Sequence, residues 1–142
     1  MKIIQYEDRY RDDMIFMVLE AKNALGVVPR LNEDLLDIQR NYFSRGDKFW
    51  LAINGGDRVI GCGGYNKYAP NAAKLHRFYV KCSMKRQGIG TALLETIERS
   101  MREAGYQYSV VHLGGKAYVE SRFFYPKHGY IEYEPDHMRK EL

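Results

Sequence analysis

The sequence is poor in cysteine and has no long apolar run, and each shortage excludes a class of protein. Its two cysteines, Cys62 and Cys82, are too few and too far apart for a disulfide framework or a zinc site, so we expect no metal. No apolar run approaches the roughly 18 residues that a membrane span needs. The opening MKIIQYEDRY has no apolar signal-peptide core, so we expect a cytoplasmic protein without a membrane partner.

Long blocks of like charge are also missing. The net charge is +4, and the densest interior basic cluster is the short string MKR. This mild excess suits anionic ligands, but no nucleic-acid module accompanies it, so we expect no nucleic-acid partner. A nucleic-acid-binding domain that uses KCSMKR remains only an alternative. Linkers, repeats and low-complexity segments are absent, so we expect residues 1–142 to form one domain.

Apolar periodicity and turn residues predict an α/β chain. We expect strands at 2–6, 48–54, 58–68, 74–81, 108–113, 129–134 and 137–142, and helices at 8–24, 33–45, 89–104 and 119–127, with Asp8 and Asn32 capping the first two. The segment 74–113 reads as strand, helix, strand, which predicts two parallel strands within a mixed, partly antiparallel central sheet flanked by helices. Three glycines in the strand at 58–68 indicate a bulge or the close approach of another element.

The helix at 89–104 begins without a side chain to cap it. The residues before it are Lys85, Arg86, Gln87 and Gly88, where Ser, Thr, Asp or Asn normally accepts a hydrogen bond. Two cations therefore lie at the positive end of the helix dipole, which is unfavourable unless an anion is present. Free N–H groups, cations and glycines that admit a close ligand together make an anion site. A phosphate-bearing ligand would account for all three features, whereas a water-capped turn is the simpler alternative.

Two familiar phosphate loops are excluded. No Walker string is present, and the dinucleotide fingerprint would need a glycine where Leu93 stands. The remaining pattern is a cation-x-x-Gly-x-Gly loop between a strand, HRFYV, and a long helix, with FFYPKHGY further along the chain.

In these blocks the sequence resembles the GCN5-related N-acetyltransferases (the GNAT family), which use acetyl-CoA. The resemblance is most specific in LHRFYVKCSMKRQGIGTALLETIERSMREAGY and SRFFYPKHGYIEYEPDHMRKEL, and the element order extends it to nearly the whole chain. The family loop usually begins with Arg or Gln, and Lys85 stands at that position. The resemblance implies that the strand at 75–80 splays from its neighbour at 109–113, and that pantetheine fits the gap.

The resemblance also implies roles for individual residues. The implied cofactor-binding residues are Phe78, Tyr79, Val80, Lys85, Arg86, Gln87, Gly88, Ile89, Gly90, Thr91, Tyr118 and Tyr125. The N–H of Val80 would polarise the thioester carbonyl, and Tyr125 would protonate the departing thiolate while a primary amine attacks directly. Tyr118 stands where the family often has an asparagine that contacts the cofactor.

The base and the acceptor are less defined. Lys74 stands where many relatives have glutamate, so no carboxylate is available there. His76 and His112 lie on the two splayed strands and titrate near neutrality, which makes them the candidate bases, directly or through water. The acceptor is expected to be a primary amine of a small molecule or a protein. Family members often form dimers, so a homodimer is a further expectation. A non-catalytic CoA-binding sensor with the same fold is the alternative function.

Overall fold

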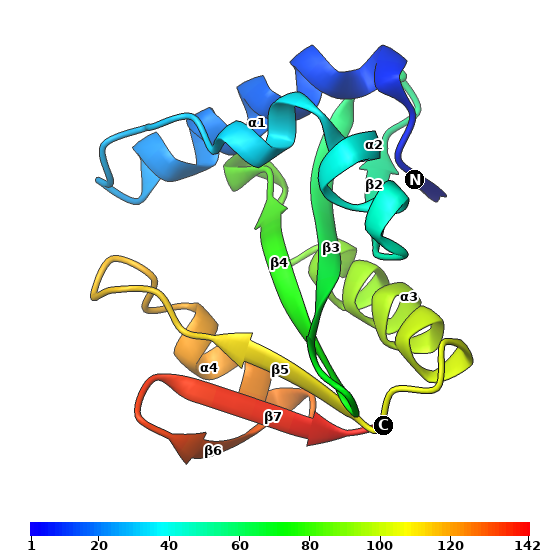
Figure 1. Cartoon of the computed structure of the whole chain (residues 1–142). Helices are drawn as coiled ribbons and strands as arrows, with labels where there is room; N and C mark the ends of the chain where they lie inside the picture. Colours follow the sequence, from blue (N-terminus) through cyan, green and yellow to red (C-terminus); the bar gives the residue numbers. More distant parts are fainter.

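The computed structural model describes all 142 residues and places every strand in one sheet (Figure 1). The strands are β1 (Lys2–Gln5), β2 (Lys48–Ile53), β3 (Val59–Ala69), β4 (Ala72–Val80), β5 (Tyr108–His112), β6 (Ile131–Glu134) and β7 (His137–Glu141). The helices are α1 (Arg11–Ala24), α2 (Ile38–Asn41), α3 (Ile89–Glu103) and α4 (Ser121–Lys127), with short 3-10 turns at Asp8–Tyr10, Glu33–Leu36, Phe43–Arg45 and Cys82–Met84. None of the helices combines the length and the apolar character needed to cross a membrane.

The sheet is mixed, as the sequence predicts. Its order is β1-β2-β3-β4-β5-β7-β6, and only the β4–β5 pairing is parallel. That pairing joins residues Ala72, Ala73 and Lys74 of β4 to Tyr108, Ser109 and Val110 of β5 and then stops. Beyond it the two strands diverge, which is plain in Figure 1. The expected splayed parallel pair is therefore confirmed.

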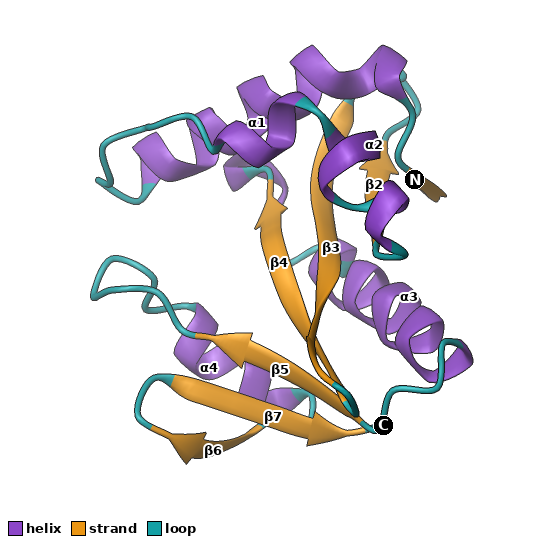
Figure 2. Cartoon of the chain, in the orientation of Figure 1, coloured by secondary structure: helices purple, strands orange, loops and turns teal.

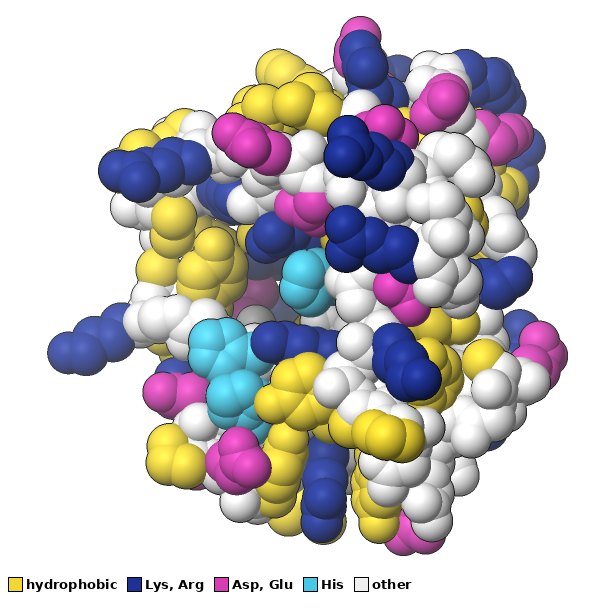
Figure 3. Space-filling model, in the orientation of Figure 1, with side chains coloured by type: hydrophobic (Ala, Val, Ile, Leu, Met, Phe, Trp, Pro, Cys, Tyr) yellow, Lys and Arg dark blue, Asp and Glu magenta, His cyan; other side chains and the backbone are white.

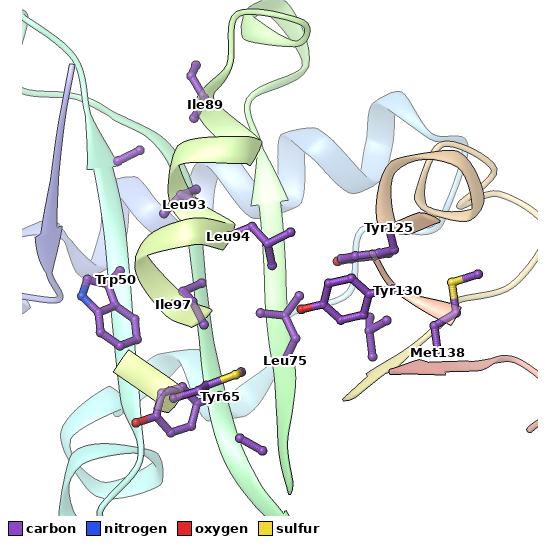
Figure 4. Close-up of a cluster of buried hydrophobic side chains, with 14 of the residues drawn as sticks. Trp50, Tyr65, Leu75, Ile89, Leu93, Leu94, Ile97, Tyr125, Tyr130 and Met138 are labelled. Atoms are coloured by element: carbon purple, nitrogen blue, oxygen red, sulfur yellow. The ribbon is translucent and has the colours of Figure 1, made fainter. Parts of the chain in front are cut away.

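Helices cover both faces of the sheet and create two cores (Figure 2). On one face, α1 and α2 pack with β1–β3. On the other face, α3 packs against the sheet together with Tyr125 of α4 and residues of β5 and β7 (Figure 4). Strand β2 contributes to both cores, because Phe49 and Leu51 face the α1 side while Trp50 and Ala52 face α3.

The glycines of β3 allow other elements to approach the sheet closely. A Cβ atom on Gly61 would lie 2.8 Å from the Leu93 side chain of α3, and one on Gly64 would lie 2.5 Å from the carbonyl oxygen of Lys48. The register with β4 also shifts within this run. Both the bulge and the close approach expected from the sequence are therefore present.

The prediction of one continuous helix at 33–45 is wrong. Three short pieces replace it, because Asp37 and Tyr42 both leave the helical conformation, with φ of −145° and −128°. The Asp37 side chain caps α2 by accepting the N–H of Arg40 at 3.0 Å. Aspartate competes for backbone N–H groups in this way and so interrupts helices. Asn32 makes no capping hydrogen bond, whereas Gly46 ends the last piece in the left-handed conformation, with φ of 81°.

Asp8 does not cap the first helix either. It lies inside the 3-10 turn that leads into α1, and no side chain accepts a hydrogen bond from the first N–H groups there. The long helix α3 agrees with the expectation at both ends: no side chain caps its start, and Gly105, with φ of 89°, follows its end.

Gly64→Ala should lower the free energy of unfolding by about 2 kcal/mol, because the new methyl group overlaps backbone that cannot move without breaking the β2–β3 pairing. Thermal unfolding should show a midpoint several degrees lower. Gly55→Ala is the matched control, since a Cβ there meets nothing within 4 Å. Equal midpoints for the two variants would contradict the close packing at Gly64.

Candidate active site

The loop before α3 is folded so that its backbone N–H groups converge. Arg86 and Gly88 have φ of 65° and 80°, and such left-handed residues turn successive N–H groups toward one point. The N–H groups of residues 86–91 donate no hydrogen bond within the chain, and the first backbone bond of α3 is that from Ala92 to the Gly88 carbonyl. The structure therefore presents a concave set of free donors at the positive end of a long helix.

A cleft of about 610 Å³ runs from this loop along the free edge of β4 to α4. Of the residues expected to bind the cofactor, those that line the cleft are Phe78, Tyr79, Val80, Lys85, Arg86, Gly88, Ile89, Gly90, Thr91, Tyr118 and Tyr125. Gln87 is exposed and does not line it. The cleft volume lies within the range of about 300–1,000 Å³ that is common for small-molecule sites.

The N–H of Val80 points into the gap between the splayed strands. Lys81 donates its N–H to the carbonyl of Ile60 at 2.8 Å, so the adjacent antiparallel pair, Val80 with Gly61, is one without hydrogen bonds. In such a pair the N–H groups face away from the partner strand. At Val80 that direction is toward the gap left by the divergence of β5.

Tyr125 closes the cleft from the α4 side. It is 5% exposed, and its ring lies 6.3 Å from Phe78 and 5.2 Å from Phe124 between ring centroids. Figure 4 shows its hydroxyl directed from α4 toward β4. Burial, and then the nearby phenol of Tyr79, raises the pKa of Tyr125 well above its ordinary value, so the phenol stays protonated at neutral pH.

A model of the acetyltransferase (GNAT) family matches residues 8–130. The chain belongs to the GNAT acetyltransferase family. The β4–α3 block lies wholly within the matched region, and the block at 121–142 begins within it, Tyr125 included. No match was found among curated proteins.

Solved GNAT-type structures share the fold over their whole length. A GNAT acetyltransferase from Staphylococcus aureus Mu50 is 22% identical, with 99% of this chain and 98% of that chain covered and a TM-score of 0.90. A PaiA N-acetyltransferase from Thermoplasma acidophilum, in complex with coenzyme A, is 20% identical with both chains covered completely and a TM-score of 0.75. An aminoglycoside 6'-N-acetyltransferase, also complexed with coenzyme A, is 16% identical over 99% of this chain and 97% of that chain, with a TM-score of 0.74.

The cations of the GNAT loop have different surroundings. The Lys85 ammonium forms an ion pair with Glu120 at 2.8 Å, which joins the loop to the segment before α4. Arg86 is exposed and forms no ion pair. Glu120 is itself two-thirds exposed, so its pairing with Lys85 is a weak surface contact that a phosphate group could replace.

Tyr118 occupies the cleft wall opposite β4. Its ring packs so tightly on Gly114 that a Cβ there would lie 2.5 Å from the ring. Burial, and then the neighbouring Tyr118 hydroxyl, raises the pKa of Tyr79. Three tyrosine hydroxyls therefore line the cleft, with those of Tyr79 and Tyr118 beside each other, in place of the asparagine that the family often has.

His76 belongs to a polar cluster on the α1–α2 face of β4, outside the cleft beside α4. Its Nδ1 lies 3.2 Å from the hydroxyl of Tyr42, which in turn donates to Asp34 at 2.6 Å. Asp34 also accepts two-pronged hydrogen bonds from Arg77, at 2.9–3.1 Å. Burial alone would raise the pKa of Asp34, but the hydrogen bonds from Arg77 and Tyr42 outweigh it and hold that pKa below its usual range.

His112 is the last residue of β5, the strand that diverges from β4. It is exposed, and its ring lies tilted against that of His137 of β7, at 4.6 Å between centroids. The structure records no contact between it and His76. On the face drawn in Figure 3 the surface is hollowed between the α1–α2 side and the β5–β7 side, and histidine side chains lie in and beside this hollow.

Sequence reasoning missed several residues near the site. Phe124 and His128 line the cleft, and the His128 Nε2 lies 3.4 Å from the Thr91 hydroxyl. The three-residue step from Tyr125 to His128 on one short helix could have indicated this shared face. Asp34 and Tyr42 gave no such signal, because they are brought to β4 only by the tertiary fold.

Asp34→Asn should lower the free energy of unfolding at pH 7 by about 2 kcal/mol, because it leaves the guanidinium of Arg77 without its carboxylate in a partly buried place. Since the pKa of Asp34 is lowered by folding, its stabilisation is present above the ordinary carboxyl pKa and lost as the pH falls through the folded value. Urea unfolding at several pH values should therefore show the variant and the wild type converging in acid.

Asp12→Asn is the matched control for this change. Asp12 also pairs with an arginine, Arg11, at 3.0 Å, but its side chain is 87% exposed. The control should match the wild type throughout. Equal stability of Asp34→Asn and Asp12→Asn at pH 7 would contradict the role assigned to the partly buried Asp34–Arg77 pair.

Proposed function

We propose that the chain, as one domain over residues 1–142, transfers an acetyl group from acetyl-CoA to a primary amine. The observation that carries this proposal is a single continuous cleft. It begins at the free N–H groups at the start of α3, follows the free edge of β4 and ends beside Tyr125, which is 5% exposed. Acetyl-CoA has a pyrophosphate, an extended pantetheine arm and a thioester in the same order.

The residues present fit this cosubstrate. The N–H groups of residues 86–91, with the side chains of Lys85 and Arg86, supply donors and positive charge for a pyrophosphate. Gly88 and Gly90 leave the backbone accessible there, since no atom fills the space beside Gly88 and only the side chains of Phe124 and Val80 approach Gly90. The unpaired edge of β4 offers backbone groups to an extended arm.

In the reaction that we propose, the acceptor amine attacks the thioester carbon directly. The C–N bond forms, the C–S bond breaks, and the amine loses a proton to a base. The N–H of Val80 donates to the carbonyl oxygen as negative charge develops there. Tyr125 gives its proton to the departing sulfur and regains one from solvent.

Burial affects both the donor and the acceptor in the proton transfer from Tyr125 to the departing sulfur. It raises the pKa of the Tyr125 phenol, but a thiolate released in the same cleft is disfavoured for the same reason. In the cleft, the difference in pKa between the phenol and the thiol is therefore smaller than the raised pKa of the phenol alone suggests. Phe78 and Phe124 around the phenol keep water from competing for its proton.

Tyr125→Phe should reduce kcat about 100-fold or more with a panel of primary amines, while KM for acetyl-CoA changes little, because only the proton donor is lost. Tyr6→Phe is the matched control: Tyr6 is also a buried tyrosine, at 7% exposed, but it lies in the other core. Release of free CoA thiol measures turnover.

Three outcomes separate the alternatives. Loss of kcat in Tyr125→Phe alone supports the acid role. Equal activity of the two variants would remove Tyr125 from the chemistry. If the wild type binds acetyl-CoA but acetylates no amine, the chain is a CoA-binding sensor and the enzymatic proposal fails.

A further inference from the structure

The hydrogen bonds around His76 determine which of its ring nitrogens carries the proton. The Tyr42 hydroxyl lies 2.6 Å from Oδ2 of Asp34 and 3.2 Å from Nδ1 of His76. Asp34 is ionised, because Arg77 binds it through Nε and Nη2 and its pKa lies below the ordinary range. An ionised carboxylate has no proton to donate.

Only one placement of the protons satisfies the hydrogen bonds among Asp34, Tyr42 and His76. The only hydroxyl proton of Tyr42 is committed to the Asp34 carboxylate, so toward His76 the phenol oxygen can only accept. Nδ1 of His76 must therefore be the protonated nitrogen. In the neutral imidazole the other nitrogen, Nε2, then holds a free lone pair.

The fold brings these groups together through an irregularity in β4. Arg77 adopts a left-handed conformation, with φ of 53°, at the point where the register between β3 and β4 shifts. In a regular strand, consecutive side chains point to opposite faces. Here His76 and Arg77 instead both reach the Asp34–Tyr42 pair, which comes from the 3-10 turn Glu33–Leu36 and the end of α2.

We propose that Asp34 and Tyr42 are positioning residues that hold His76 as the Nδ1–H tautomer, so that Nε2 takes the proton of the acceptor amine through water. This inference rests on the acetyl transfer proposed above and selects one of its two candidate bases. His76 is on the splayed part of β4, four residues before Val80, and faces the side opposite α3. The amine, whose ordinary pKa is roughly 10, must lose a proton for the reaction to proceed.

Burial and the nearby cations keep His76 neutral at physiological pH. Burial, followed by the charge of Arg77, lowers the pKa of His76, and Lys74 acts in the same direction. Asp34 and Asp47 act in the opposite direction but do not prevail. A neutral imidazole can accept a proton across the neutral range. His112, exposed and in tilted contact with the ring of His137, has no comparable partner to fix its tautomer.

The tautomer can be measured on the free protein, without a substrate. Histidine-15N-labelled protein at pH 7.5 gives one set of ring correlations for each of its four histidines, and His76→Gln identifies the set that belongs to His76. Two-bond 1H–15N spectra should show His76 protonated at Nδ1. In Tyr42→Phe the Nε2–H form should become populated, because the acceptor at Nδ1 is gone.

Tyr10→Phe is the matched control for the loss of the phenol. Tyr10 is also buried and also donates its hydroxyl to an aspartate, Asp57, but at a distant place between α1 and the β2–β3 turn. Its removal should leave the His76 signals and the pH profile of kcat/KM unchanged. A general loss of stability would affect both tyrosine variants alike.

The pH profile of kcat/KM tests the consequence for activity. The wild type should show an acidic limb set by the low pKa of His76, and His76→Gln should lose that limb with about a 100-fold lower plateau. Tyr42→Phe should lower the plateau about tenfold or more, since a wrong tautomer cannot accept the proton. Its limb should move to lower pH, because the imidazolium also loses a hydrogen-bond acceptor.

The possible failures are distinguishable. A wild-type His76 protonated at Nε2 would overturn the tautomer assignment whatever the activity. Turnover with the same pH profile in His76→Gln and Tyr42→Phe as in the wild type would overturn the base role while leaving acetyl transfer intact. Absence of any turnover in the wild type would instead remove the proposed function, and the role of His76 as its base would fall with it.

Discussion

The short pairing of β4 with β5 is the constraint on which the rest of the structure depends. Only three residues of each strand are joined, and every later residue of β4 keeps an unpaired edge. An unpaired strand edge of this kind can form hydrogen bonds with a further strand. Here α3 begins just beyond it, so that the free N–H groups of the loop and the free edge of β4 face one cleft. One gap in a sheet thus supplies both a site for an anion and a site for an extended chain.

Because β4 and β5 are paired over only three residues, other contacts must hold the β5–β7 arm against the rest of the protein. Buried polar groups provide such contacts. Glu98 of α3 is 3% exposed and accepts hydrogen bonds from Tyr130 at 2.9 Å and from Lys140 of β7 at 3.0 Å. The Tyr130 hydroxyl also lies 2.7 Å from that of Ser109 on β5. Hydrogen-bonded groups of this kind have fixed directions, which apolar packing lacks. They therefore set the angle of the β5–β7 arm relative to α3, and with it the position of Tyr125 opposite β4.

The sequence alone was sufficient to predict those features that depend on a few neighbouring residues. The period of α3, its uncapped start and the terminating Gly105 depend on a few neighbouring residues, and the structure confirms each of them. The continuous helix expected at 33–45 failed because Asp37 has a local alternative to helix that periodicity does not record. The cluster of Asp34, Tyr42 and His76 could not be predicted, since it joins segments up to 42 residues apart through a bulge in β4.

Thermal unfolding with acetyl-CoA, and separately with ADP, tests most directly whether the cleft is built for this cosubstrate. At about 100 times the dissociation constant a ligand adds roughly 2.7 kcal/mol to the free energy of unfolding, which should raise the midpoint by several degrees. ADP shares the pyrophosphate but lacks the pantetheine arm, so acetyl-CoA should produce the larger rise. No rise at saturating acetyl-CoA, or a rise no larger than that with ADP, would contradict the account of the splayed strands as the binding gap.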